Sequence, residues 1–203
     1  MNDMKIKYYL PVAGILFLFS CGSNSSQTDT AQAANDSNQA KMDSSKKNND
    51  TTAMSASISD HDTKFAVDAA NIGMMEIALG KVAQQNAKSK DVKDFGAMMV
   101  KDHTSAGDEL KKIADAKHIT LPTELSADDQ KKIDDMKATT GKSFDKSYID
   151  MMVKGHKNAA DEFQEEIKQG SDADLRAFAT KTLDVIHAHL NAAQKCQSME
   201  KGM

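Results

Sequence analysis

Residues 90–117 read KDVKDFGAMMVKDHTSAGDELKKIADAK, and the hydrophobic pattern of this stretch indicates the fold class. Its apolar residues recur three or four positions apart, as they do along one face of an α-helix. The stripe consists of Val92, Phe95, Met99, Ala106, Leu110 and Ile113. The spacing therefore predicts one long amphipathic helix that directs a single face toward a core.

Three further stretches of similar length carry the same period, and we expect a helix over residues 62–87, 143–169 and 172–198. Their stripes contain Phe65, Ala69, Ile72, Leu79 and Ala83, then Tyr148, Met152, Ala159, Phe163 and Ile167, and then Leu175, Ala179, Thr182, Ile186, Ala193 and Cys196. Gly170, directly after the third long helix, is a natural helix C-cap. A short helix is expected from Ser126 to near Gly141, because Ser126 is a good N-cap and two aspartates follow it.

Helix-breaking residues are rare, since the only prolines are Pro11 and Pro122. Four long helices with one apolar stripe each predict an all-α fold, most simply a four-helix bundle over residues 59–199. The short extra helix would lie between the second and third long helices. The formal charge of −4, with lysines and acidic residues interspersed, gives no indication of nucleic-acid binding.

The N-terminus has the composition of an export sequence. A short basic region precedes the apolar run Tyr8–Phe19, which is too short to span a bilayer but fits a secretory signal peptide over residues 1–20. Leu18-Phe19-Ser20-Cys21-Gly22 resembles a bacterial lipobox, so Cys21 is predicted to carry a lipid. The alternative is an ordinary signal peptide that is cleaved nearby.

Residues 22–57 are mostly polar and contain no aromatic side chain, and such a segment buries too little apolar surface to offset the entropy of ordering. We therefore expect residues 21–58 to comprise the lipidated Cys21 and a disordered polar tether. The predicted location is the cell envelope, on the periplasmic side of a membrane, with membrane contact through the lipid anchor only.

Each long helix has one polar residue on its apolar stripe. These residues are Glu76, His103, His156 and His189. They lie near the middle of their helices, and the midpoints of equally long bundled helices share one level. His189 is displaced from its midpoint by about four residues, roughly 6 Å along the axis. The four side chains should therefore converge in one layer of the core.

One carboxylate and three imidazoles can bind a single divalent transition metal, for which Zn, Fe, Mn and Cu are candidates. The same residues can also satisfy one another by hydrogen bonds and form a purely structural polar layer. Asp102, beside His103, could orient a ligating imidazole. Met99 and Met152 lie one turn before two of the histidines, where a thioether suits Cu(I) or simply fills the core.

Several of these motifs together are similar to those of a bacterial exported four-helix domain family of unknown function. The matching residues are Glu76, Met99–His103, Leu121-Pro122, Phe144-Asp145, Tyr148, Met152–His156 and His189-Leu190 with Ala193. The family is ferritin-like in fold and often labelled outer-membrane protein, so the resemblance implies a ferritin-like bundle at the outer membrane. Gly155 departs from the acidic residue that is usual before the second histidine.

The resemblance supplies no activity, and the motifs of several enzyme classes are absent. Oxidative di-iron bundles use Glu-x-x-His on two helices, and this sequence contains no such motif. Neither a nucleophile-elbow Gly-x-Ser-x-Gly nor a haem-attaching Cys-x-x-Cys-His is present, and no haem or nucleotide is expected. Two hypotheses remain: a metal-binding envelope lipoprotein, and a non-catalytic scaffold or stress-protective module. Whether the protein is an enzyme stays open.

Overall fold

The computed structural model describes residues 29–48 and 58–201, and within them it contains α-helices and no β-strands. The predicted signal peptide and Cys21 lie outside the described residues. No helix in the described part combines the length and the apolar character needed to cross a membrane. The helices are α1 (Thr30–Asn48), α2 (Asp60–Asn86), α3 (Lys90–Lys117), α4 (Ala127–Lys137), α5 (Gly141–Gln169) and α6 (Ala173–Lys201). The all-α prediction is confirmed.

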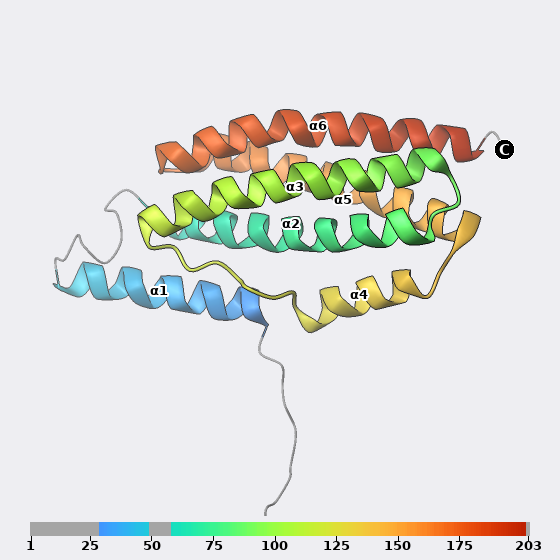
Figure 1. The fold of residues 1–203 in the computed structure, drawn as a ribbon. Helices are drawn as coiled ribbons and strands as arrows, with labels where there is room; N and C mark the ends of the chain where they lie inside the picture. The colour runs from blue at the N-terminus through green and yellow to red at the C-terminus, as the bar shows by residue number, and fades with distance from the viewer. Residues whose placement is uncertain (1–28, 49–57, 202–203) are drawn as a thin grey trace, which may run out of the picture.

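The four long helices α2, α3, α5 and α6 lie side by side (Figure 1). Short connections make two antiparallel pairs, α2 with α3 and α5 with α6, and the pairs then pack against each other through α2 with α5 and α3 with α6. Each long helix begins and ends within about three residues of the boundaries that its hydrophobic period predicts. The short helix between the second and third long helices is α4.

The core consists of two apolar halves with a polar level between them. One half contains Leu79, Met99, Met152 and Ala193, and the other contains Ala69, Leu110, Ala159 and Ile186. On every long helix the two halves lie on opposite sides of the polar residue that interrupts the stripe. The interruption therefore falls at the same height on all four helices.

Local capping explains two of the helix starts. The Ser59 side chain accepts a hydrogen bond from the backbone N–H of Asp62, whose carboxylate accepts the backbone N–H of Ser59 in return, which forms a capping box. Ser126 caps α4 in the predicted way. Gly170 follows α5, but its φ of −57° is not left-handed. A side chain there would instead collide with the Glu166 carboxyl group.

Helices α2 and α3 approach each other at two glycines. A Cβ atom on Gly80 would lie 2.7 Å from the carbonyl oxygen of Gly96, and one on Gly96 would lie 2.8 Å from that of Gly80. Neither position has room for any larger residue without a shift of the backbone. This contact sets the spacing of the α2–α3 pair, which supplies two of the four polar residues.

Part of the expected tether is helical in the structure. Residues 30–48 form α1, whereas the polar composition of residues 21–58 led us to expect disorder. The reason is a set of contacts with a distant loop. The buried Asn38 accepts the backbone N–H of Thr120 at 2.7 Å and donates to its carbonyl oxygen at 3.0 Å, and Met42 packs into the apolar core. These contacts stabilise α1, which has no continuous apolar stripe of its own.

A buried acidic cluster joins the start of α2 to the connection between α5 and α6. Asp62 accepts the backbone N–H groups of Ser171 and Asp172. Glu166, fully buried, lies 3.1 Å from His61 Nε2. Burial, followed by the nearby charge of Asp62, raises the pKa of Glu166 to about 8. The Glu166 carboxyl group is therefore protonated at neutral pH.

Candidate metal centre

The four polar residues of the predicted layer come from the four long helices, and all are buried. Their exposed fractions are 3% for Glu76, 8% for His103, 0% for His156 and 1% for His189. Each lies one helical turn from an apolar residue on either side, so the helical period directs it inward. Buried polar groups at this depth need partners, and the structure shows which partners they have.

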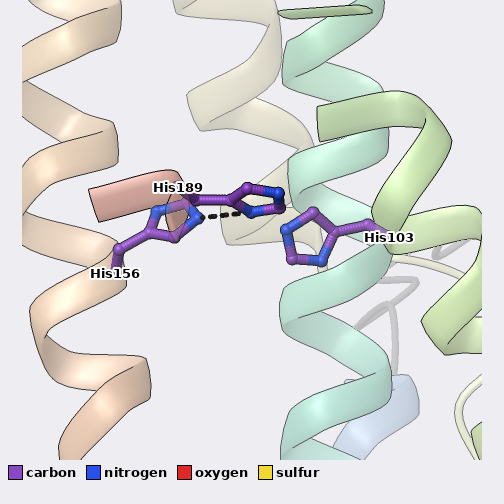
Figure 2. A group of neighbouring side chains, drawn as sticks. All are labelled: His103, His156 and His189. Carbon is purple, nitrogen blue, oxygen red and sulfur yellow. Dashed lines mark hydrogen bonds between the residues drawn. The ribbon is translucent and has the colours of Figure 1, made fainter. Parts of the chain in front are cut away.

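The three histidines converge on one point. A ligand nitrogen from each of them lies within 4.8 Å of those of the other two, in the one group of this kind found among the described residues. Figure 2 shows the rings of His156 and His189 joined by a short contact, with one ring nitrogen of His103 directed toward them. His189 therefore reaches the level of the other two despite its offset along α6, which extends to Lys201.

His156 and His189 are each anchored from outside this group. His156 Nδ1 lies 2.9 Å from the carbonyl oxygen of Met152, and His189 Nε2 lies 3.1 Å from Asp102 Oδ2. Carbonyl and carboxylate oxygens only accept, so we assign the ring hydrogens to these outer nitrogens. The inner nitrogens, His156 Nε2 and His189 Nδ1, then each present a lone pair.

These two inner nitrogens face each other at 3.3 Å. Two lone pairs at this distance repel unless a cation lies between them. Two nitrogens bound to one zinc ion at about 2.0–2.1 Å and at the tetrahedral angle would be about 3.3–3.4 Å apart. The distance therefore matches one edge of a tetrahedral metal site, and it is long for a direct hydrogen bond.

His103 and Glu76 complete the layer from α3 and α2. His103 Nε2 lies 2.9 Å from Glu76 Oε2, but the alignment is too poor for a hydrogen bond, so this buried nitrogen has no well-aligned partner. Glu76 Oε1 lies 3.5 Å from His156 Nδ1. The carboxylate thus lies beside two of the three histidines and outside the group that the three imidazoles form.

The protonation states suit metal ligands. Burial lowers the pKa of His156 and His189, although Glu76 and Asp102 respectively act in the opposite direction. Burial alone would raise the pKa of Glu76, but its contact with His103 and the charges of the neighbouring imidazoles outweigh burial and lower it. The lowered pKa values favour neutral imidazoles at His156 and His189 and an ionised carboxylate at Glu76, which are the forms that bind a metal ion.

The structure gives different roles to the three residues that the sequence analysis placed beside the histidines, namely Asp102, Met99 and Met152. Asp102 binds His189 on α6, and not the adjacent His103, because successive helix residues point in different directions. Met99 and Met152 are buried in one apolar half of the core, where they act as packing residues. Met152 also contributes its backbone carbonyl to His156, a contact that no side-chain pattern indicates.

Tyr148 is a buried polar residue that the hydrophobic pattern does not single out, because tyrosine also occurs on apolar stripes. It is fully buried, and among the described residues its hydroxyl group has no hydrogen-bond partner. Burial, followed by the charges of Glu76 and Cys196, raises its pKa. The hydroxyl group therefore keeps its proton at neutral pH.

Comparison with known proteins identifies the family. The chain matches no curated protein and no solved structure. A family model matches residues 47–196, which span α2 to most of α6 and contain all four polar residues of the layer. That match covers most of the sequence, and the protein therefore belongs to the family described as domain of unknown function DUF4142.

Proposed function

We propose that this protein binds one divalent transition metal ion in the core of a ferritin-like four-helix bundle. His103, His156 and His189 would supply three nitrogen ligands, and Glu76 would supply the carboxylate. The observation that carries the proposal is the pair of facing imidazole nitrogens, 3.3 Å apart, each with its other nitrogen anchored outside the pair. A cation between them removes their repulsion, and the ionised Glu76 balances part of its charge.

Zn, Fe, Mn and Cu all accept imidazole and carboxylate ligands, and the 3.3 Å edge fits zinc well. To complete the site, His103 and Glu76 would both move inward, because the three nitrogens now span up to 4.8 Å and the carboxylate lies outside the group that they form. Asp102 and the Met152 carbonyl would hold the other two imidazoles in orientation, as outer partners of metal-bound histidines do. The single carboxylate argues against a di-iron centre.

The test is a metal analysis of the Cys21→Ser chain, which cannot carry the lipid. The protein is stripped with a chelator, dialysed against a mixture of the four metals and analysed by mass spectrometry for metal content. We expect one metal ion per chain, and less than about a tenth of that in His156→Ala. His187→Ala is the matched control, because His187 lies exposed on α6, two residues from His189. The absence of stoichiometric metal would refute the site.

A structural polar layer is the second candidate, and one observation favours it: His156 and His189 both have protein partners without any metal. In that case the layer would set the helix register of a scaffold or stress-protective module. Replacing His103, His156 and His189 together by leucine would then preserve or raise the stability measured in chelator. If metal binding is the function, the triple leucine variant should still fold but should no longer bind the metal ion.

We further propose that the protein is exported and lipid-anchored through Cys21 on the periplasmic side of a membrane, with the outer membrane as the expected one. The short basic region, the apolar run and the lipobox-like Leu18-Phe19-Ser20-Cys21 support this proposal. Metabolic labelling with radioactive palmitate and membrane fractionation test it. The native chain should be labelled and sediment with membranes, and Cys21→Ser should be unlabelled and soluble. A Cys21→Ser chain that still sediments would refute it.

A further inference from the structure

A cavity of about 580 Å³ reaches the polar layer from one side. Glu76, His103 and His156 form part of its wall, and the rest is mostly apolar. The apolar wall includes Ala69, Leu110, Ala159, Phe163, Phe178 and Ile186. Its volume is in the range of small-molecule sites, which also combine an apolar lining with a few polar groups.

The cavity reaches the surface near the connection between α3 and α4. The exposed Lys111 and Asp115, and the connection at residues 119–123, belong to its wall. Lys111 and Asp115 form an ion pair at 2.7 Å, so this outer end presents no unbalanced charge. Helix α1 holds the connection in place through Asn38. The cavity is thus a channel from a nearly neutral entrance to the polar layer.

Two glycines in its wall have no packing reason to be glycine. A Cβ atom on Gly73 of α2 or on Gly107 of α3 would meet nothing within 4 Å, in contrast to Gly80 and Gly96. Glycine within a helix is unfavourable relative to alanine. These residues keep space open beside the polar layer, although side chains there would stabilise the helices.

We propose that this cavity binds an alkyl carboxylate of medium chain length, with its carboxylate group at the metal and its chain along the apolar wall. The inference rests on the proposed metal site, because three neutral imidazoles and one carboxylate leave a divalent ion with a net positive charge that attracts an anion. The apolar wall then selects the chain.

Isothermal titration of the Cys21→Ser chain with sodium octanoate, in the absence of detergent, tests the proposal. The zinc-loaded protein should bind one octanoate per chain, and hexanoate about 15-fold more weakly, because each methylene group is worth about fourfold. Gly73→Leu should weaken octanoate binding about tenfold or more while zinc content stays at one ion per chain. Asp108→Leu is the matched control, since Asp108 is exposed on α3 and outside the cavity wall.

Octan-1-ol separates the roles of the metal and the cavity. Removing zinc should weaken octanoate binding about tenfold or more, and should change octan-1-ol binding by less than about threefold. Stoichiometric zinc without octanoate binding, or equal octanoate affinity in Gly73→Leu, would overturn the proposal and leave the metal site standing. Failure to bind zinc, together with octan-1-ol binding that Gly73→Leu abolishes, would overturn the metal site and support the alkyl cavity.

Discussion

Replacing Gly80 by alanine should destabilise the protein, and the same change at Gly73 on the same helix should stabilise it. A Cβ atom on Gly80 would lie 2.7 Å from the Gly96 carbonyl oxygen and 3.0 Å from Val100 Cγ2. Forcing a methyl group into a packed contact costs about 1–3 kcal/mol, and the backbone obstacle places this case at the upper end. The gain of about 1 kcal/mol in helix propensity offsets part of it. The net loss is about 2 kcal/mol.

At Gly73 only the propensity gain applies, because no atom lies within 4 Å of the added Cβ. The expected gain is about 0.5–1 kcal/mol. Urea unfolding in chelator, followed by far-ultraviolet circular dichroism, measures the change in unfolding free energy of both variants, and heating the same samples gives their melting temperatures. At about 2–4 °C per kcal/mol, the melting temperature should fall by about 4–8 °C for Gly80→Ala and rise by about 1–4 °C for Gly73→Ala. A Gly80→Ala protein as stable as the wild type would refute the packing argument.

Three further predictions concern substitutions of Asp102, Glu166 and Asn38. Asp102→Asn should weaken zinc binding about 10–100-fold in a chelator competition, because it loses the carboxylate that orients His189. Glu166→Gln should raise the unfolding free energy at pH 8 and make it less dependent on pH, as urea titrations between pH 5 and pH 8 would show. Asn38→Ala should remove the two hydrogen bonds to Thr120 and increase amide hydrogen exchange in residues 30–48.

The sign of the Glu166 prediction follows from its raised pKa. Between its ordinary value of 4.5 and about 8, the folded protein keeps a proton that the unfolded chain releases. The wild-type unfolding free energy therefore falls as the pH rises through this interval, by at most about 1.4 kcal/mol per pH unit. Below pH 4.5 both states are protonated and the difference disappears. An identical pH dependence in Glu166→Gln would contradict this linkage.

Controls distinguish local effects from general ones. Asp108→Asn removes an exposed carboxylate from the same helix as Asp102 and should leave zinc affinity unchanged. For Asn38→Ala, the amide protection of α2 and α3 should stay as in the wild type, because α1 packs outside the four long helices. Unchanged exchange in residues 30–48 would show that Asn38 does not hold α1 in place.

Hydrophobic periodicity is sufficient to predict the four long helices and the polar layer, but not α1. A helix repeats every 3.6 residues and rises about 1.5 Å per residue, so the spacing of apolar residues defines both the buried face and the height along the axis. Glu76, His103, His156 and His189 interrupt four such faces near mid-helix, and all four are buried in the structure. Their convergence needed no information beyond period and length.

The contacts between distant groups and the position of the cavity depend on the packing of the helices. Asp102 pairs with a histidine 87 residues away, and Asn38 orders α1 through a residue 82 positions distant. Such partners depend on how helices are placed against one another, which local periodicity does not encode. The cavity beside Gly73 likewise results from how side chains of several helices pack together, so the sequence of one helix does not reveal it.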